Sequence, residues 1–370
     1  MTTTTYARTD ALTAEHWSRR LAHEVSKATP IAPLIGSGPD SIIQLKTETQ
    51  KSKGDQITFG LRTQLTGAGV TEGTTLEGNE ESLTTYSESL IINEINHAVR
   101  VAADDTISAQ RVKHSLREEA IMGLKDWYAD RLSLMFFLQV CGYTPTSITF
   151  EGETVSLKNV HWGHNTPTAA STDRIIRKSG AANDQSLTSS DTFTLDLVDK
   201  AKEMARVANP RIRPIRVDGG DHYVMYLHPY QVTDMRTNTS DGQWLDIQKA
   251  AEKRGRNNAI FTGALGVYNG VILRESEHVT TGVDSSDTSE ESDVRRAVLL
   301  GAQACVAAFG QNRGPTKYTM VEKNFDYDRE LGVACKTIMG MKKVQFSTNS
   351  GTDSDFGSVV VSTYAAAHTS

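Results

Sequence analysis

Residues 56–62 read QITFGLR, and this alternating strand opens the stretch, 54–141, that decides the fold. A segment rich in glycine, threonine and glutamate follows at 66–85. A second alternating strand comes next, with four apolar residues near one face: Ile91, Ile95, Val99 and Val101. Alternation of this kind is typical of half-buried strands. The pattern predicts an extended hairpin loop over residues 46–86.

The tip of this hairpin has few large apolar residues. Because an isolated two-stranded hairpin is marginal in water, we expect the limb to gain its stability from another surface, supplied by sister copies of the chain. A chain that projects such an arm resembles a building block more than a catalyst with a pocket.

A long helical pattern follows at residues 108–141. Its apolar residues recur every three to five positions: Val112, Leu116, Ala120, Leu124, Trp127, Leu132 and Met135. This spacing predicts a single helix with one apolar face. At 1.5 Å per residue it would be roughly 50 Å long.

The hairpin tip is acidic. No Lys or Arg lies between Arg62 and Arg100, whereas six glutamates do: Glu72, Glu77, Glu80, Glu81, Glu88 and Glu94. One interpretation is a solvated loop; the other is a tip that meets a basic patch on another subunit. The candidate patches are Lys249, Lys253, Arg254 and Arg256, or Arg111, Lys113 and Arg117. The predicted inter-subunit contacts are Trp17, Arg62, Glu72, Glu77, Glu80, Glu81, Lys253, Arg254 and Arg256.

From residue 192 the pattern becomes compact α/β. A helix is predicted at 195–207, then strands at 212–217 and 222–228 around the turn 218–221, and a helix at 229–236. The polar, acidic segment 277–292 reads as a flexible loop. Residues 331–347 read as strand, turn and strand, with Gly340 near the turn.

Composition limits the class of protein. The 370 residues are 38% apolar and 23% charged with a net charge of -6, which suits a soluble protein and argues against tight binding of nucleic-acid phosphates. No apolar run approaches a membrane span, so no membrane partner is expected. The three cysteines, Cys141, Cys305 and Cys335, are expected to be buried free thiols.

No set of residues suggests catalysis. His161 and His164 have metal-like spacing but lack a recognisable third ligand. A hairpin turn explains Asp218, Asp221 and His222 better than a carboxylate–histidine pair does. We therefore expect no enzymatic activity, no cofactor and no metal.

Several blocks, in family order, resemble the major capsid proteins of tailed bacteriophages, in the branch typified by the coat protein of coliphage N-four. They are LTGAGVT at 65–71 with LEGNEE at 76–81, INHAVR at 95–100, FTG at 261–263, YNGV at 268–271, ESEH at 275–278, AVLLGAQA at 297–304, and the stretch from FDY at 325–327 to GMKKVQF at 340–346.

This resemblance implies an α+β fold of the Hong Kong 97 type. It divides the chain into an N-terminal arm at 1–45, the extended hairpin loop at 46–86, a peripheral domain at 87–194 with spine helix 108–141, and an axial domain at 195–275. Residues 276–370 would return to both domains and end in a tail. The implied role is a self-assembling icosahedral shell of hexamers and pentamers.

The resemblance also implies partners and a location. The packaged double-stranded DNA would lie nearby without sequence-specific binding. Scaffolding protein, portal and decoration protein would be separate chains. The product would be part of the virion, assembled in the cytoplasm of the bacterial host. The alternatives are a nanocompartment shell of the same fold, or an enzyme of unrecognised class near Asp218 and His222.

Overall fold

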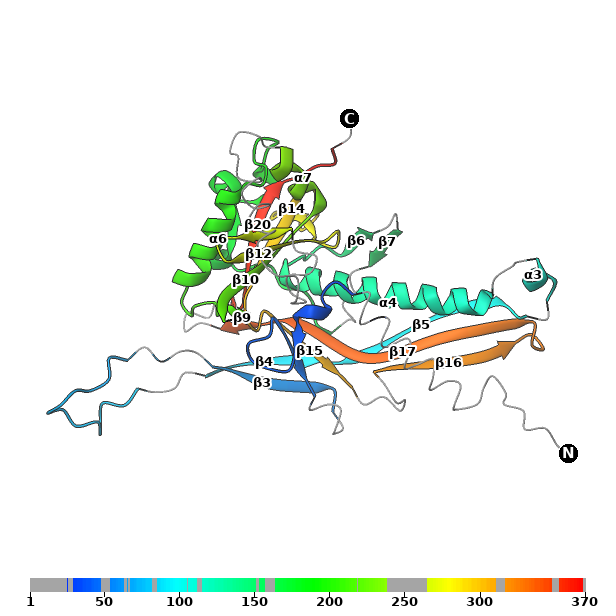
Figure 1. Cartoon of the computed structure of the whole chain (residues 1–370), viewed down its shortest axis with the longest axis horizontal. Coiled ribbons are helices and arrows are strands. Elements are labelled where there is room, and N and C mark those ends of the chain that lie inside the picture. The colour runs from blue at the N-terminus through cyan, green and yellow to red at the C-terminus, as the bar shows by residue number, and fades with distance from the viewer. Residues whose placement is uncertain are drawn as a thin grey trace.

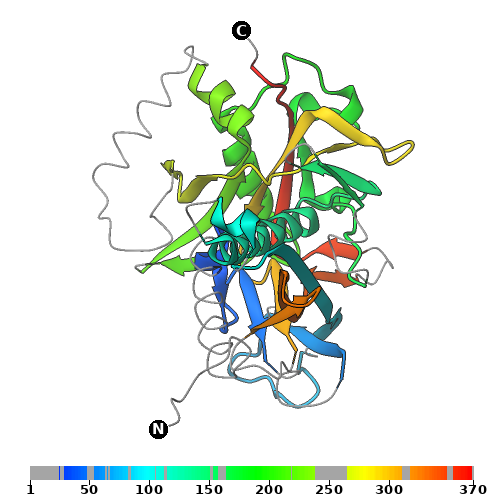
Figure 2. The same ribbon diagram turned by 90° about the vertical axis from the view of Figure 1, so that its right-hand side faces the viewer.

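A computed structural model describes residues 25, 29–47, 54–62, 65, 67–81, 85–104, 106–111, 115–150, 153–156, 164–217, 219–237, 265–310, 317–347 and 353–368. The described chain forms two larger sheets, one beside the other, with a long helix running between them (Figures 1 and 2). A hairpin projects from one end of the molecule, and the N-terminal end of that helix points toward the other end.

The six-stranded sheet combines segments from both ends of the chain. Its order is β1 (Ile35–Gly36), β2 (Ile43–Lys46), β15 (Cys305–Phe309), β17 (Glu330–Lys343) and β16 (Tyr318–Phe325), with β5 (Asn93–Ala102) also paired to β17. Three small ladders accompany the larger sheets: β3 (Gln56–Arg62) with β4 (Thr85–Ile91), β6 (Ser147–Phe150) with β7 (Glu153–Ser156), and β18 (Gln345–Ser347) with β19 (Asp353–Asp355).

The eight-stranded sheet lies above it in Figure 1. Its order is β11 (Gly266–Tyr268), β12 (Val271–Glu275), β10 (Gly220–Leu227), β14 (Glu290–Leu300), β20 (Ser358–Tyr364) and β8 (Ile175–Arg177), with β13 (Thr281–Val283) on β14 and β9 (Ile215–Val217) on β10. One face packs against the helices α6 (Leu195–Val207) and α7 (Pro229–Thr237). Four short 3-10 helices complete the described elements: η1 (Ala32–Leu34), η2 (Thr172–Arg174), η3 (Lys178–Gly180) and η4 (Asp184–Ser186).

The helix α4 (Leu116–Val140) packs on one face of the six-stranded sheet, against β5 and β17. The Tyr128 hydroxyl donates to the carbonyls of Cys335 at 2.8 Å and Ile95 at 3.2 Å. Almost every residue in its second half is buried, because this half also meets the eight-stranded sheet. The ring of Phe137 lies 5.2 Å from that of Tyr226. This helix therefore connects the two sheets through one core.

The prediction of one helix over 108–141 is wrong at its start. A separate short helix, α3 (Ile107–Gln110), ends at Arg111, and α4 begins only after Ser115. Ser115 is extended and its side chain accepts the amide of Glu118 at 3.4 Å, which makes it a helix cap. The predicted helix 195–207 and the strand 56–62 are confirmed.

Two predicted irregular segments are strands. Gly340 lies inside β17, where a Cβ atom would come within 2.3 Å of the Ile91 carbonyl, so the glycine serves a close approach of two backbones. Residues 277–292 contain β13 and the start of β14, which pair with each other. Pairing with a partner strand outweighs the polar composition of this segment.

Candidate assembly surfaces and the joint between the two sheets

The acidic tip, defined here as the described residues 65 and 67–81, projects away from both sheets (Figure 1). The side chains of Glu72, Glu77, Glu80 and Glu81 are exposed. Two leucines, Leu65 and Leu76, are about 60% exposed beside them. Large apolar side chains in water next to a single sign of charge suit a surface that contacts another molecule.

Two of the four predicted glutamates shape the tip itself. Glu81 accepts the amide of Gly67 at 2.6 Å, which joins the two ends of the loop. Glu80 accepts the amide of Gly78 at 2.7 Å. Neither Glu72 nor Glu77 makes an ion pair or hydrogen bond within the described residues. These two carboxylates are therefore the ones that remain available for a partner.

The base of the hairpin is packed on its own chain. Ile57, Phe59 and Leu61 of β3 are buried in a cluster that includes Val306 and Phe346. The Asn165 side chain joins the cluster's edge, because it accepts the Ile91 amide at 3.1 Å and donates to the Ile91 carbonyl at 2.6 Å. The expectation that the whole limb depends on sister copies is thus wrong for the base; only the tip lacks such support.

Most of the predicted partners of the tip lie outside the described residues. These are Trp17, Lys253, Arg254 and Arg256, together with Lys113 and Lys249 of the candidate patches; for Arg62 only the backbone, paired with Thr85, is described. Arg111 is exposed. Arg117 is excluded as a free cation, since it donates twice to Glu322, at 2.7 and 3.0 Å, and is 13% exposed.

A basic face that the sequence reasoning missed lies on the six-stranded sheet, opposite α4. It consists of Arg100 on β5, Lys336 on β17 and Lys323 on β16, all exposed. Arg100 is paired with Glu330 at 3.0 Å, so Lys323 and Lys336 carry most of the positive charge of this face. Arg100 and Lys323 flank Gly332 in register and lie over the Phe325 ring, at 4.2 and 5.3 Å. The signal was available as a period of two along three strands.

The far end of this sheet carries an unusual turn. Asp326, Tyr327 and Asp328 all have positive φ angles, of 49°, 52° and 67°, and the Tyr327 side chain is fully exposed. A hollow of about 640 Å³ beside it is lined by Arg100, Ile107 and neighbouring residues. Three consecutive left-handed residues and an aromatic ring in water are costly for an isolated subunit, so this end also suits a contact surface.

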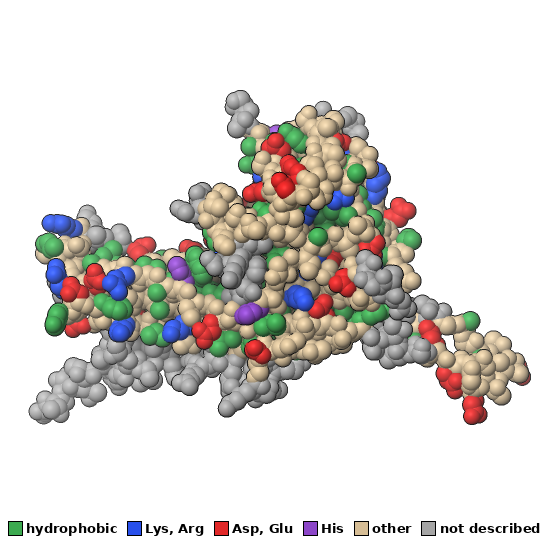
Figure 3. Space-filling model, turned by 180° about the vertical axis from the view of Figure 1, so that it is seen from behind, with side chains coloured by type: hydrophobic (Ala, Val, Ile, Leu, Met, Phe, Trp, Pro, Cys, Tyr) green, Lys and Arg blue, Asp and Glu red, His purple; other side chains and the backbone are tan. Residues whose placement is uncertain are grey.

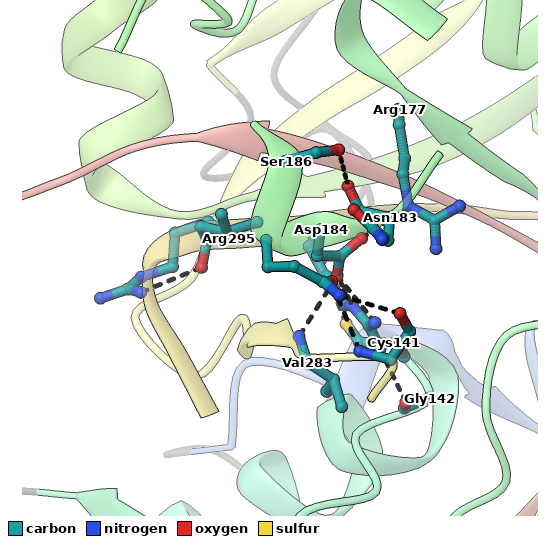
Figure 4. A network of polar contacts seen from close by, with 12 residues as sticks. Cys141, Gly142, Arg177, Asn183, Asp184, Ser186, Val283 and Arg295 are labelled. Carbon is teal, nitrogen blue, oxygen red and sulfur yellow. Dashed lines mark hydrogen bonds and ion pairs between the residues drawn. The ribbon is translucent and has the colours of Figure 1, made fainter. Parts of the chain in front are cut away.

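The eight-stranded sheet meets the C-terminal end of α4 at a buried charge network (Figure 4), called the joint below. The Asp184 carboxylate, 0% exposed, accepts from the Arg296 guanidinium at 2.7 Å, from Arg177 Nε at 2.8 Å and from the Val283 amide at 3.3 Å. Burial alone would raise the pKa of Asp184, but Arg296 and Arg177 hold this pKa below its usual range.

Arg296 also reaches the end of α4. Its Nη1 donates to the carbonyl of Gly142 at 2.8 Å and to that of Cys141 at 3.3 Å. A cation at the C-terminus of a helix satisfies free carbonyls and is favoured by the helix dipole, by about 0.3–1 kcal/mol and more when buried. Arg296 thus links the strand β14 to the helix that lies on the other sheet.

A second buried pair lies nearby. Lys343 Nζ, 1% exposed, is 2.8 Å from Asp355 Oδ1 and donates to the carbonyls of Thr168 and Ala169, each at 3.1 Å. Gln345 donates to the same carboxylate at 2.9 Å. Every charge in this part of the core therefore has a partner, as buried charges require.

Comparison with known proteins decides the family. A model of the family described as phage capsid protein matches residues 3–367. The chain belongs to this family. The major capsid protein of Pseudomonas phage KPP25 is 27% identical over 371 residues, covering 95% of this chain and 94% of that protein.

Solved capsids agree in fold. The capsid of Ralstonia phage GP4 matches with a TM-score of 0.80 and 28% identity, over 91% of each chain. The capsid of cyanophage Pam1 matches with a TM-score of 0.66 and 23% identity, over 92% of this chain and 93% of that one. The chain is thus a phage major capsid protein, a component of the virion, with the Hong Kong 97-like fold that the resemblance implied.

The residues considered as a possible metal or catalytic site do not form one within the described residues. Asp218 and 161–163 lie outside the described residues, and His164 is exposed. Asp221 faces Arg216 at 3.7 Å, and the His222 Nδ1 lies 3.3 Å from the Gly270 carbonyl. Within the described ranges, no three His, Cys, Asp or Glu side chains gather as metal ligands do. None of the helices described there combines the length and hydropathy that a membrane crossing requires.

The cysteines are buried free thiols, as predicted. Burial raises the pKa of each thiol, to about 11 for Cys141 and about 12 for Cys335, and likewise raises that of Cys305. At neutral pH these side chains therefore act as small apolar groups.

Proposed function

We propose that copies of this capsid protein close into an icosahedral shell of hexamers and pentamers around the double-stranded DNA of a tailed phage. The acidic tip of one copy lies on the basic face of the next. This pairing is supported by the separation of charge along an elongated subunit. The acidic side chains of the tip lie at one end (Figure 3), and the exposed Lys323 and Lys336 lie on β16 and β17 of the six-stranded sheet.

This arrangement supports assembly for a physical reason. A tip and a face that differ from each other make heterologous contacts, which generate closed rings when the rotation closes. Charge complementarity fixes the register and the partner, and many modest contacts add through multiplicity. The net charge of -6 suits a shell that holds DNA without binding it tightly.

The domain division predicted from the sequence enters this proposal with two changes. β8, inside the predicted peripheral segment 87–194, is counted with the axial part, and β1 and β2, at the end of the predicted arm 1–45, are counted with the peripheral part. The six-stranded sheet with α4 is the peripheral part, and the eight-stranded sheet with α6 and α7 is the axial part at the centre of each capsomer. The part of 1–45 that precedes β1 is the proposed N-terminal arm. Scaffolding, portal and decoration proteins are separate partners, and assembly takes place in the host cytoplasm.

A charge exchange tests the pairing of the two surfaces. Glu72→Lys with Glu77→Lys should give folded subunits that form few shells, because both charges then face Lys323 and Lys336. Adding Lys323→Glu and Lys336→Glu should restore shells, counted by negative-stain microscopy. Normal yield of the first variant, or no recovery in the second, would contradict the pairing. Reversing Glu80 and Glu81 is a poorer test, since both hold the loop together.

The cargo is tested separately. Nuclease-protected double-stranded DNA in particles purified from infected cells supports the phage shell. Particles that hold protein and no DNA would indicate a nanocompartment instead, and a sharp monomer peak in sedimentation under assembly conditions would contradict both shells.

A further inference from the structure

The joint lies where the hairpin and six-stranded part of the subunit is connected, through α4, to the eight-stranded part. The acidic tip, the basic face and the Tyr327 turn all belong to the hairpin and six-stranded sheet, while the eight-stranded sheet carries α6 and α7. The shape of the subunit therefore depends on how one sheet is oriented on the other. Any change of that orientation moves every contact of one part relative to the other.

Most of the junction is apolar. The second half of α4 and the facing strands form one cluster that includes Phe137, Tyr226 and Val298. Apolar packing is non-directional, and cores tolerate hydrophobic rearrangement before they lose the fold. Such a surface alone leaves the angle between the sheets weakly specified.

The joint adds hydrogen bonds, which depend on direction, to this apolar packing. The planar guanidinium of Arg296 has Asp184 on one side and the carbonyls of Cys141 and Gly142 on the other. A guanidinium presents its donors in a fixed fork, so it transmits orientation in a way that a point charge does not. Buried ion pairs often add little net stability, and their best-attested use is to select one arrangement.

We propose that Arg296, positioned by Asp184, sets the angle between α4 and the eight-stranded sheet and thereby the curvature of the shell. This inference rests on the proposed shell function. Arg296 is a positioning residue here: it is buried and acts through α4.

Because α4 is long, a small change of angle at the joint causes a large displacement at its far end. Its 25 residues span roughly 38 Å at 1.5 Å per residue. A tilt of about 5° at the joint would displace the far end by about 3 Å. This displacement is several times the spread of about 0.5 Å in hydrogen-bond distances. Repeated in every copy, such a shift changes the diameter at which the shell closes.

The test compares conservative changes in two ion pairs, the buried Arg296–Asp184 pair and the partly buried Arg117–Glu322 pair. Arg296→Lys keeps the charge but loses the fork; Arg117→Lys does the same to the Arg117–Glu322 pair, which lies wholly within the six-stranded part. Shells assembled from each variant and from the wild type are measured for diameter by cryo-electron microscopy. Arg296→Lys should shift or broaden the diameter distribution, or leave open sheets, while Arg117→Lys shells match the wild type.

Asp184→Glu, which retains the carboxylate but displaces it by one methylene, is a second test and should give the same change of diameter. Unchanged diameters for both joint variants would overturn the inference. Failure of both to fold would also overturn it, because the pair would then serve the fold and not the angle. If wild-type subunits form no shells at all, the proposed function fails and not this inference alone.

Discussion

The acidic tip and the joint are both built on carboxylates, yet they differ in what those carboxylates face. Glu77 stands in water with no partner in the described chain, whereas Asp184 is fully buried and accepts from two arginines and a backbone amide. The joint satisfies its charges inside one subunit. The tip leaves its charges for another molecule.

This difference predicts opposite responses to mutation. Removing one partner of a buried ion pair costs about 3–5 kcal/mol, because the other charge stays buried. Removing an exposed charge costs less than about 1 kcal/mol. Changes at the joint should therefore reduce the stability of the subunit, and changes at the tip should reduce its assembly.

The largest effect is expected for Arg296→Ala. The Asp184 carboxylate would keep only Arg177 as a charged partner, and the carbonyls of Cys141 and Gly142 would lose their donor. The free energy of unfolding should fall by about 3–5 kcal/mol, measured by urea unfolding of soluble subunits. A loss below 1 kcal/mol would mean that the joint behaves like an exposed pair.

Leu61→Ala tests whether the hairpin base belongs with the joint or with the tip. Leu61 is 1% exposed in the cluster with Val306 and Phe346. Truncation should lower the free energy of unfolding by about 2–5 kcal/mol. Leu76→Ala in the exposed tip is the matched control and should leave unfolding nearly unchanged. Equal effects of the two changes would contradict the distinction between base and tip.

Gly340→Ala tests the packing of the hairpin base from β17, the strand that approaches Ile91. The added methyl group would collide with the Ile91 carbonyl and crowd the Asn165 amide that holds the hairpin base. Overpacking of this kind costs about 1–3 kcal/mol, measurable as a lower unfolding midpoint. Gly123→Ala, at a helical glycine with open space, should not destabilise the subunit and serves as the control.

Acid should weaken the joint. The pKa of Asp184 is lower in the folded chain than the usual value near 3.9, so its ionised form favours folding above about pH 4. That contribution is lost as the pH falls through the folded-state pKa. The difference in unfolding free energy between wild type and Asp184→Asn should therefore shrink as the pH is lowered from 6 to 3. A constant difference would show that the charge of Asp184 is irrelevant.

The smallest effect on the subunit is expected for Glu72→Gln with Glu77→Gln. Both side chains are exposed, so unfolding should change by less than about 0.5 kcal/mol. Shell yield should nevertheless fall and lose part of its dependence on salt, because screened charge steers the contact. Light scattering at several ionic strengths would measure this, and an unchanged salt dependence would contradict the role of the two charges.

Features with a local signal could be predicted from the sequence. The alternation at 56–62 and the helical spacing at 195–207 each gave the observed bounds. The exposed glutamates could be located because no cation lies near them in the chain. Such patterns depend on neighbours within a few residues, which a single sequence displays.

Features that depend on distant neighbours could not be predicted from the sequence. Gly340 was predicted to lie near a turn. A glycine is needed there because the backbone of Ile91, which is distant in the sequence, approaches closely. Asp184 and Arg296 are 112 residues apart, and neither lies in a sequence motif that predicts a buried ion pair. The break at Ser115 was hidden because the apolar spacing continues across it.

The position of β20 has a consequence for timing. Residues 358–364 lie between β14 and β8, with six of the seven side chains buried, so the eight-stranded sheet stays split until this late segment arrives. A chain still attached to the ribosome short of residue 364 lacks a central strand of that sheet. The eight-stranded sheet can therefore be completed only after this segment has been synthesised.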